Sequence, residues 1–266
     1  MKYITEKYNS LLDFKKSLER ESVGYTAKEF NPDFIGCQSE EKANELLLNG
    51  DQKSVRMINE KQKKSFVQSK NKLYKSNIGF TPCMGAVMAG HPCNMYNIRS
   101  VKYKDSKIIN IFYALDVDWR VNHKDIAAVG AKILNVVASL EHIGYRVNLY
   151  VTSVSHPVIG AKRKCDFNKL LSLFIRIKES GKQLNISKIA FPLANPAFYR
   201  WFSFKWNNTV CKDIVNTVVL TTEDYIFKYK ESICKNFRFT EKDFIIESYY
   251  TLKNKSETAI MKDILR

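Results

Sequence analysis

The sequence predicts an α/β protein in which residues 101–266 form a three-layer, mostly parallel sheet with one antiparallel hairpin at its edge. From residue 107 onward, apolar runs typical of strands alternate with helical periodicity. Two neighbouring strand patterns, 145–153 and 170–178, have no helical pattern between them, which favours a hairpin. The chain has 266 residues, 45% of them hydrophobic, which is enough for one large core or a core with a helical appendage. We therefore expect parallel strands covered by helices on both faces.

The first hundred residues differ from the rest and predict a mainly helical or irregular region, residues 1–100. Apolar residues over 11–18 predict a short amphipathic helix. Ser39 stands where it would cap a second helix over residues 40–48, which would end at Asn49-Gly50.

The most basic stretch runs from residue 51 to residue 76, and it predicts a solvated helix or an extended arm. With the basic loop near residue 163, it could follow a phosphate backbone, in keeping with the net charge of +16. The alternative is that this charge reflects the composition of an AT-rich genome and forms only solvated faces. The candidate nucleic-acid-binding residues are Lys53, Arg56, Lys61, Lys63, Lys64, Lys162, Arg163 and Lys164.

The first elements of the α/β part are a buried strand and a long helix. Residues 107–115 form a nearly continuous apolar run, which is typical of a strand covered on both faces. Residues 124–143 carry apolar side chains at helical spacing, and Gly144 would end this helix. The alternating strand 145–153 follows, and then the apolar strand 170–178.

The last part of the chain predicts further alternation. Asn195-Pro196 would open an aromatic helix, with proline in the first turn. A strand over 214–220, a helix beginning at Thr222, a strand over 244–250 and a helix over 255–265 complete the pattern.

The aromatic helix, Phe198–Trp206, has apolar side chains on most sides. Such a helix must be covered on most sides, which predicts that it is wedged between the sheet and the N-terminal region. The functional alternatives are a base-stacking platform and a protein interface, for which aromatic and arginine side chains are typical. The candidate interface residues are Tyr199, Arg200, Trp201 and Trp206.

From residue 107 to residue 266 the element order resembles a von Willebrand factor type A domain, which has a central hydrophobic strand, a helix, a short hairpin and then alternating helices and strands. The resemblance implies an adhesion-type module. Such domains often hold a divalent metal through Asp-x-Ser-x-Ser after the first strand. Here Asp116-Val117-Asp118-Trp119-Arg120 keeps the first aspartate and loses both serines. Mg²⁺ at Asp116 and Asp118 is one interpretation; helix capping or pairing with Arg120 is the other.

Three segments resemble an uncharacterised family of bacteriophage proteins. They are residues 85–95 (GAVMAGHPCNM), 131–147 (AKILNVVASLEHIGYRV) and 190–200 (AFPLANPAFYR). The resemblance implies a bacteriophage origin and no particular activity.

The cysteines and histidines give no recognised site. Cys83, His91 and Cys93, with Cys37 as a fourth ligand, could hold zinc, but zinc ligands usually come as two close pairs. A packed loop with free thiols is the alternative. The sequence contains no G-x-S-x-G, H-E-x-x-H, P-loop or G-x-G-x-x-G motif.

The sequence therefore favours a non-enzymatic phage protein, a virion component or assembly factor that binds phage or host proteins and needs no cofactor. The alternatives are a protein that binds DNA or RNA and a metal-dependent enzyme at Asp116 and Asp118. No apolar run approaches the roughly 20 residues of a membrane span, and the first residues lack a signal-peptide pattern. We expect the host cytoplasm or the virion as its location, without a membrane partner.

Overall fold

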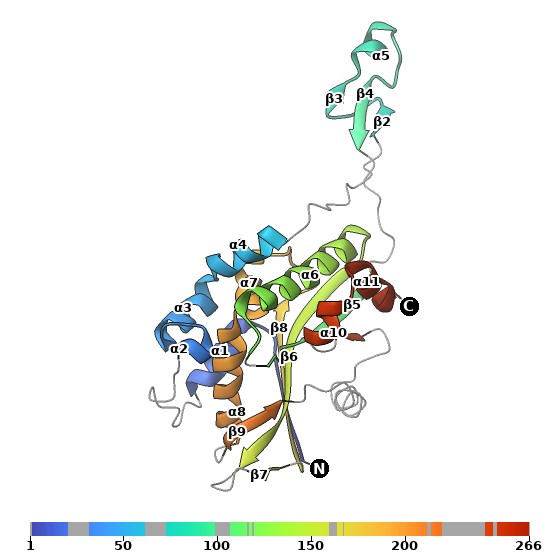
Figure 1. Cartoon of the computed structure of the whole chain (residues 1–266). Coiled ribbons are helices and arrows are strands. Elements are labelled where there is room, and N and C mark those ends of the chain that lie inside the picture. Colours follow the sequence, from blue (N-terminus) through green and yellow to red (C-terminus); the bar gives the residue numbers. More distant parts are fainter. Residues whose placement is uncertain are drawn as a thin grey trace.

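The computed structural model describes an α/β protein with two sheets and a layer of helices (Figure 1). The larger sheet has seven strands, and the smaller has three. The α/β class that the sequence predicts is confirmed. The described residues are 2–20, 32–61, 73–98, 107–115, 117–118, 120–159, 164–166, 168–211, 214–219, 243–246 and 249–265.

The larger sheet is mixed, and its main path runs in the order β1-β8-β6-β5-β10. Three of the four neighbouring pairs along this path are parallel, and β6 with β8 is the antiparallel pair. Two further strands pair with β6 in antiparallel fashion. The strands are β1 (Lys2–Tyr8), β5 (Ile108–Ala114), β6 (Arg146–Ile159), β7 (Lys164–Cys165), β8 (Lys169–Lys178), β9 (Ile214–Val219) and β10 (Asp243–Ile246).

Strand β5 lies inside the sheet, between β6 and β10. Ile111 is paired with Leu149 on one side and with Phe244 on the other. Ile111, Phe112 and Tyr113 are all buried, so both faces of the strand are covered. The apolar run that predicts an interior strand here is therefore confirmed.

The antiparallel pair β6 and β8 is confirmed, but its predicted position at the sheet edge is wrong. Strand β1 pairs in parallel with β8 over seven residues, from Lys2↔Lys169 to Tyr8↔Ile175. The sequence pattern does not predict this strand, because β1 mixes charged and apolar residues over a short length. Its apolar positions, Ile4 and Tyr8, pack on the core, while Lys7 is exposed. The N-terminal region is therefore not only helical.

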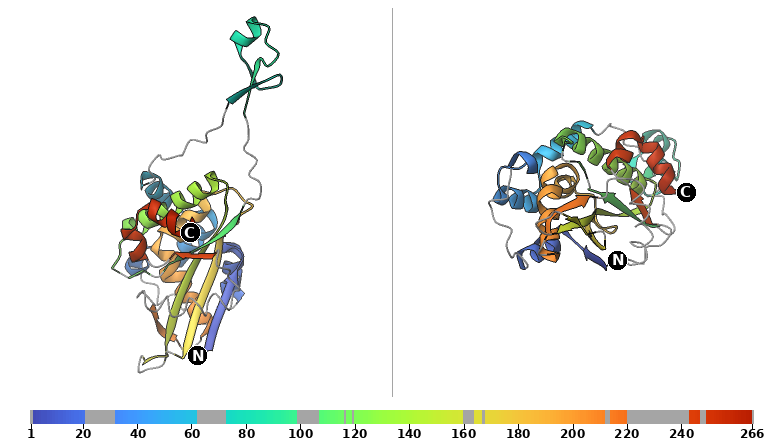
Figure 2. Two further views of the ribbon diagram at one scale, coloured as in Figure 1. Left: turned by 90° about the vertical axis from the view of Figure 1, so that its right-hand side faces the viewer. Right: turned by 60° about the horizontal axis from the view of Figure 1, so that its bottom comes forward.

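The helices of the main body, meaning the described residues outside 73–98, share one core with one face of the large sheet (Figure 2). Ile111, Leu149 and Leu173 of the sheet belong to this core. No described helix packs on the opposite face, and the expected helix at Thr222 lies outside the described residues. The helices are α1 (Leu11–Arg20), α2 (Pro32–Ile35), α3 (Glu40–Asn49), α4 (Gln52–Lys61), α6 (His123–His142), α7 (Ile186–Ala194), η2 (Phe198–Ser203), α8 (Phe204–Val210), α10 (Tyr249–Asn254) and α11 (Glu257–Leu265).

Side chains cap the helices where the sequence predicts. The Ser39 hydroxyl accepts a hydrogen bond from the Lys42 N–H at 3.2 Å and starts α3. Gly50 ends it at φ 86°, and a β-carbon there would meet the Ser187 carbonyl oxygen at 2.2 Å. Only glycine suits this position, because it needs both a positive φ and a close approach.

The end of the chain differs from its predicted pattern in one respect. Strand β10 is shorter than expected, because Tyr249 and Tyr250 belong to helix α10 rather than to a strand over 244–250. Among the described helices, none is long and apolar enough to cross a membrane.

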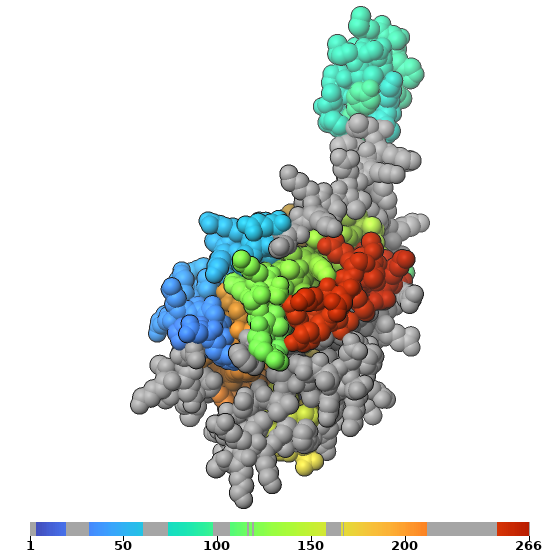
Figure 3. Space-filling model, in the orientation of Figure 1, coloured from blue at the N-terminus to red at the C-terminus, as the bar shows by residue number. Residues whose placement is uncertain are grey.

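Residues 73–98 form a small unit with its own sheet, which we call the projecting unit. Its strands are β2 (Leu73–Ser76), β3 (Thr81–Pro82) and β4 (Met95–Ile98), in the order β2-β4-β3, and helix α5 spans Met84–Met88. The unit stands clear of the main body in Figures 1 and 3. The domain boundary expected near residue 100 falls outside the described residues.

Candidate functional site

The carboxyl end of β5 carries Asp118, which forms an ion pair with Arg120. The Arg120 Nε and Nη2 each donate to a different Asp118 carboxylate oxygen at 3.0 Å, and the Arg120 backbone N–H donates at 2.9 Å. These hydrogen bonds lower the pKa of Asp118 to about 2. The pairing with Arg120 that the sequence left open is therefore present. Asp116 lies outside the described residues.

The expected Mg²⁺ site gains no support from this arrangement. Both Asp118 oxygens already accept from Arg120, and an adjacent guanidinium opposes a cation. Within the described ranges, no group of three His, Cys, Asp or Glu side chains could hold a metal ion.

Arg200, from η2, joins three segments around the same strand end. Its guanidinium donates to the carbonyl oxygens of Phe34 at 2.9 Å, Val121 at 3.1 Å and Asp118 at 3.3 Å. The side chain is buried, and this burial lowers its pKa. Arg200 therefore holds α2 and the segment between β5 and α6 against the aromatic helix.

A buried polar cluster lies where α4, α6 and α7 meet. The Asp51 carboxylate accepts hydrogen bonds from the Ser54 hydroxyl at 2.6 Å and from the Asn195 amide at 2.7 Å. Burial raises the pKa of Asp51, but the hydrogen bonds from Ser54 and Asn195 outweigh it and lower the pKa overall. His123, at the start of α6, lies with its Nε2 at 3.3 Å from the Ser54 hydroxyl oxygen.

This cluster has the residue types of a serine hydrolase but not the geometry. The single hydroxyl hydrogen of Ser54 is given to Asp51, so the His123 Nε2 must donate to Ser54 rather than accept from it. A nucleophilic serine needs the opposite arrangement, with histidine as the base and the aspartate behind the histidine. The cluster therefore has a structural role. Its members are up to 144 positions apart in the chain, so spacing could not reveal it.

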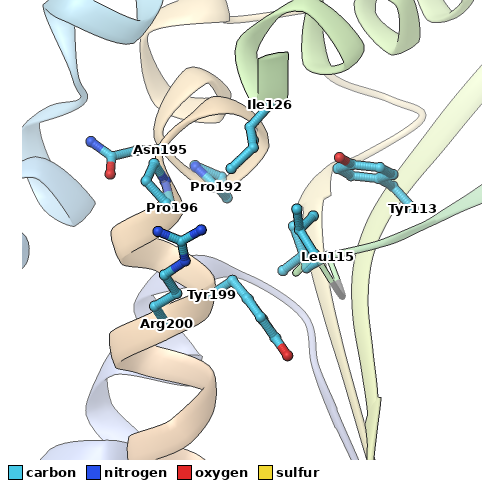
Figure 4. A pocket seen from close by; sticks show the side chains of 9 residues that line it. Tyr113, Leu115, Ile126, Pro192, Asn195, Pro196, Tyr199 and Arg200 are labelled. Atoms are coloured by element: carbon cyan, nitrogen blue, oxygen red, sulfur yellow. The ribbon is translucent and has the colours of Figure 1, made fainter. Parts of the chain in front are cut away.

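A cavity lies beside this cluster, between β5, α6 and the aromatic helix (Figure 4). Its volume is about 10 Å³, which has room for roughly one water molecule. The polar side chains at its wall are those of Tyr113, Asn195, Tyr199 and Arg200. In this conformation the cavity cannot hold a substrate of metabolite size.

The aromatic helix is covered, as one of the two interpretations of the sequence requires. Asn195 caps its start by accepting from the Ala197 N–H at 2.9 Å, and the chain continues through the π-turn η2 into α8. The candidate interface residues are at most 7% exposed, so these side chains offer no surface to a partner: Tyr199, Arg200, Trp201 and Trp206. The indole Nε1 of Trp206 instead donates to the Glu6 carboxylate at 2.7 Å and ties α8 to β1.

The projecting unit exposes most of its apolar side chains. Within the described part of the chain, six of the twelve exposed large hydrophobic residues belong to it, while Ala86 is its single buried side chain among those described. Met88 is 86% exposed, Ile78 is 74% exposed and Phe80 is 59% exposed. The six residues are Tyr74, Ile78, Phe80, Met84, Val87 and Met88.

Hydrogen bonds rather than a core shape this unit. The Cys83 N–H donates to the Asn94 carbonyl at 2.7 Å, and the Cys83 thiol donates to the Tyr96 hydroxyl at 3.3 Å. Hydrogen bonding to Tyr96 lowers the pKa of Cys83. The proposed zinc ligands are not brought together, because Cys37 packs into the core of the main body. Cys37, Cys83, Cys93 and Cys211 are free, as expected.

The candidate nucleic-acid-binding residues are tested only in part. Lys53 and Arg56 are exposed on α4, which packs against α6 and α7. Lys61 ends α4 and Lys164 begins β7, but their side chains are not described. The other four candidates lie outside the described residues: Lys63, Lys64, Lys162 and Arg163.

Residues 2–266 match a sequence family described as a domain of unknown function (DUF7192). The match runs through the large sheet, the helical layer and the projecting unit alike, so the unit lies inside the region that defines the family. No curated protein and no solved structure matches the chain.

Proposed function

We propose that this chain, which belongs to the family described as a domain of unknown function (DUF7192), works without catalysis by binding another protein through its projecting unit. The observation that carries the proposal is the exposure of Ile78, Phe80, Met88 and three further large apolar side chains in residues 73–98. Grouped exposed apolar side chains are typical of interaction surfaces.

The lack of a core in the projecting unit supports the same proposal. Small units normally need a core, a metal, a disulfide or an oligomeric partner to stay folded. Here Ala86 is the single buried side chain among those described, and the described cysteines Cys83 and Cys93 are free. Covering one large apolar side chain stabilises by about 1.5–3 kcal/mol. A protein partner that covers several of them would therefore stabilise the unit as it binds.

The sequence resemblances extend this proposal to a role. The protein would be a bacteriophage virion component or an assembly factor that meets phage or host proteins in the host cytoplasm or in the virion. One of the three segments that resemble phage proteins, residues 85–95, lies in the projecting unit. The proposed likeness to type A domains, which serve adhesion, would require β5 to be an interior strand, and β5 lies between β6 and β10.

The proposal is tested by removing the apolar surface of the unit. The variant Ile78→Ser/Phe80→Ser/Met88→Ser alters exposed side chains, and Leu12→Ser/Leu48→Ser is a matched control in the main body, where both leucines are about half exposed. Tagged proteins are isolated from infected cells and their co-purifying proteins are quantified. We expect the amount of a defined co-purifying partner to fall at least tenfold for the unit variant and to stay unchanged for the control. Identical partner sets for all three proteins would overturn the proposal.

A second candidate function is nucleic-acid binding, and one observation favours it. Lys53, Arg56 and Lys124 are exposed on α4 and at the start of α6, two helices that pack together. Among the described residues, none of these three cations has a carboxylate partner within 4.0 Å, whereas Lys15, Lys42 and others do. Unpaired cations on one face suit contacts to phosphates.

A further inference from the structure

We infer that the partner of the projecting unit is a second copy of this chain, so that two units pack together through their apolar side chains about a two-fold axis. This inference rests on the proposed function and names its partner. Homodimers with two-fold symmetry bury the same patch on both copies. A patch that is apolar throughout can be complementary to itself without matching charges.

The charge distribution favours self-association at this unit rather than elsewhere. The whole chain has a net charge of +16, so most surfaces of two copies repel each other. Within residues 73–98, Lys75 is the single Lys, Arg, Asp or Glu. The projecting unit is therefore the part of the chain at which two copies can approach with the least repulsion. Apart from Lys75, it offers no Lys, Arg, Asp or Glu side chain that would select an oppositely charged partner.

The size of the apolar surface fits a small dimer interface. The six side chains are between 41% and 86% exposed. Large side chains exposed to this extent present on the order of 100 Å² each, so the six together present roughly 600 Å². A stable interface buries about 800 Å² per partner. The six apolar side chains, with backbone and polar atoms beside them, reach this range. The projection of the unit beyond the main body lets two units meet while the basic bodies stay apart (Figure 3).

A protein partner fits this unit better than a lipid bilayer does. The order β2-β4-β3 leaves β2 and β3 as edge strands of the small sheet. Strand edges have backbone groups that need hydrogen-bond partners, and the hydrocarbon of a membrane supplies none. A second polypeptide can supply them through its own strand edge.

Light scattering coupled to size-exclusion chromatography tests the inference on the full chain over a range of concentrations. We expect the mass to rise from 30.9 kDa to twice that value. The double variant Phe80→Ser/Met88→Ser should dissociate at least tenfold more readily, while Leu12→Ser/Leu48→Ser should behave as wild type. The substitution Ile78→Lys provides a second test, because it places a charge on a side chain that is 74% exposed and bears little on folding.

The salt dependence of its stability distinguishes this dimer from other assemblies. Lys70, Lys72 and Arg99 flank the unit in sequence, so two copies bring like charges near each other, and screening should strengthen the dimer. A dimer that dissociates at high salt would overturn the inference. So would a wild-type monomer at every concentration. If wild type is a monomer, but the variant Ile78→Ser/Phe80→Ser/Met88→Ser loses a co-purifying protein that wild type retains, the proposed function stands with a different partner. If the wild-type monomer instead floats together with anionic vesicles, the partner is a membrane.

Discussion

At the scale of single residues, the hydrogen bonds that Asp51 accepts matter for stability. It accepts from the Ser54 hydroxyl and the Asn195 amide, and also from the backbone N–H groups of Lys53 and Ser54. It thereby caps α4 and fixes the turn before the aromatic helix. The sequence could not predict this cluster, because an Asp after Gly50 looks like an ordinary helix cap and nothing in the pattern points to Asn195 as its partner.

The substitution Asp51→Asn should reduce stability at neutral pH by about 1–3 kcal/mol, because an amide cannot accept all of these hydrogen bonds. The pKa of Asp51 is lower in the folded chain than its ordinary value of 3.8. Its contribution is therefore complete above about pH 4 and is lost as pH falls through the lower, folded pKa. Urea unfolding at pH 7 and at pH 3 measures this. The difference between wild type and Asp51→Asn should be largest at pH 7 and smaller at pH 3, because pH 3 lies below the ordinary pKa of 3.8; an equal difference at both values would contradict the role of the carboxylate.

At the scale of elements, the sequence predicts those strands and helices whose hydrophobic periodicity is regular. It does not predict the elements whose periodicity is irregular. The strand β5 and the helix α6 were predicted because long apolar patterns mark them. Strand β1 was not predicted because its charged positions interrupt the apolar pattern of a strand. Without β1 beside β8, the hairpin β6-β8 was predicted to lie at the sheet edge. Helix α7 was missed because Pro192, which usually interrupts a helix, lies inside it. The candidate interface residues on the aromatic helix are buried, which the sequence could not predict because residue types alone cannot distinguish a buried surface from an exposed one.

The packing of α6 on α7 gives a prediction with a matched control. Gly130 of α6 faces α7, and a β-carbon there would lie 2.7 Å from the Leu193 carbonyl oxygen. Gly130→Ala should therefore push the two helices apart and reduce stability by about 1–3 kcal/mol, although alanine favours a helix. At Gly181 a β-carbon would meet nothing within 4 Å, so Gly181→Ala should change stability by less than about 1 kcal/mol. Thermal unfolding of both variants measures the difference. Equal melting temperatures would show that the helices adjust without cost.

At the scale of the whole molecule, the chain combines a basic body with a projecting unit that is nearly free of charge. The net charge could be read from composition, but its separation from the apolar surface could not, because the apolar residues of 73–98 look like those of an ordinary core. The two properties respond to salt in opposite directions. As the salt concentration rises, screening strengthens apolar contact between like-charged copies. Contacts to phosphates weaken instead, because the counterions that binding releases enter a solution that already holds more salt.

This opposition makes salt dependence the sharpest test of the nucleic-acid alternative. If Lys53 and Arg56 contact phosphates, the logarithm of the affinity for a DNA or RNA duplex should fall linearly with the logarithm of the salt concentration. Replacing both by alanine should reduce that slope by about 1.8, since each phosphate contact contributes about 0.9. The control Lys16→Ala/Lys262→Ala removes the same charge from two exposed positions on α1 and α11. If both variants reduce the slope equally, the attraction comes from overall charge and the α4 surface is not a specific site. If only the α4 variant does, Lys53 and Arg56 contact phosphates and the basic body binds nucleic acid.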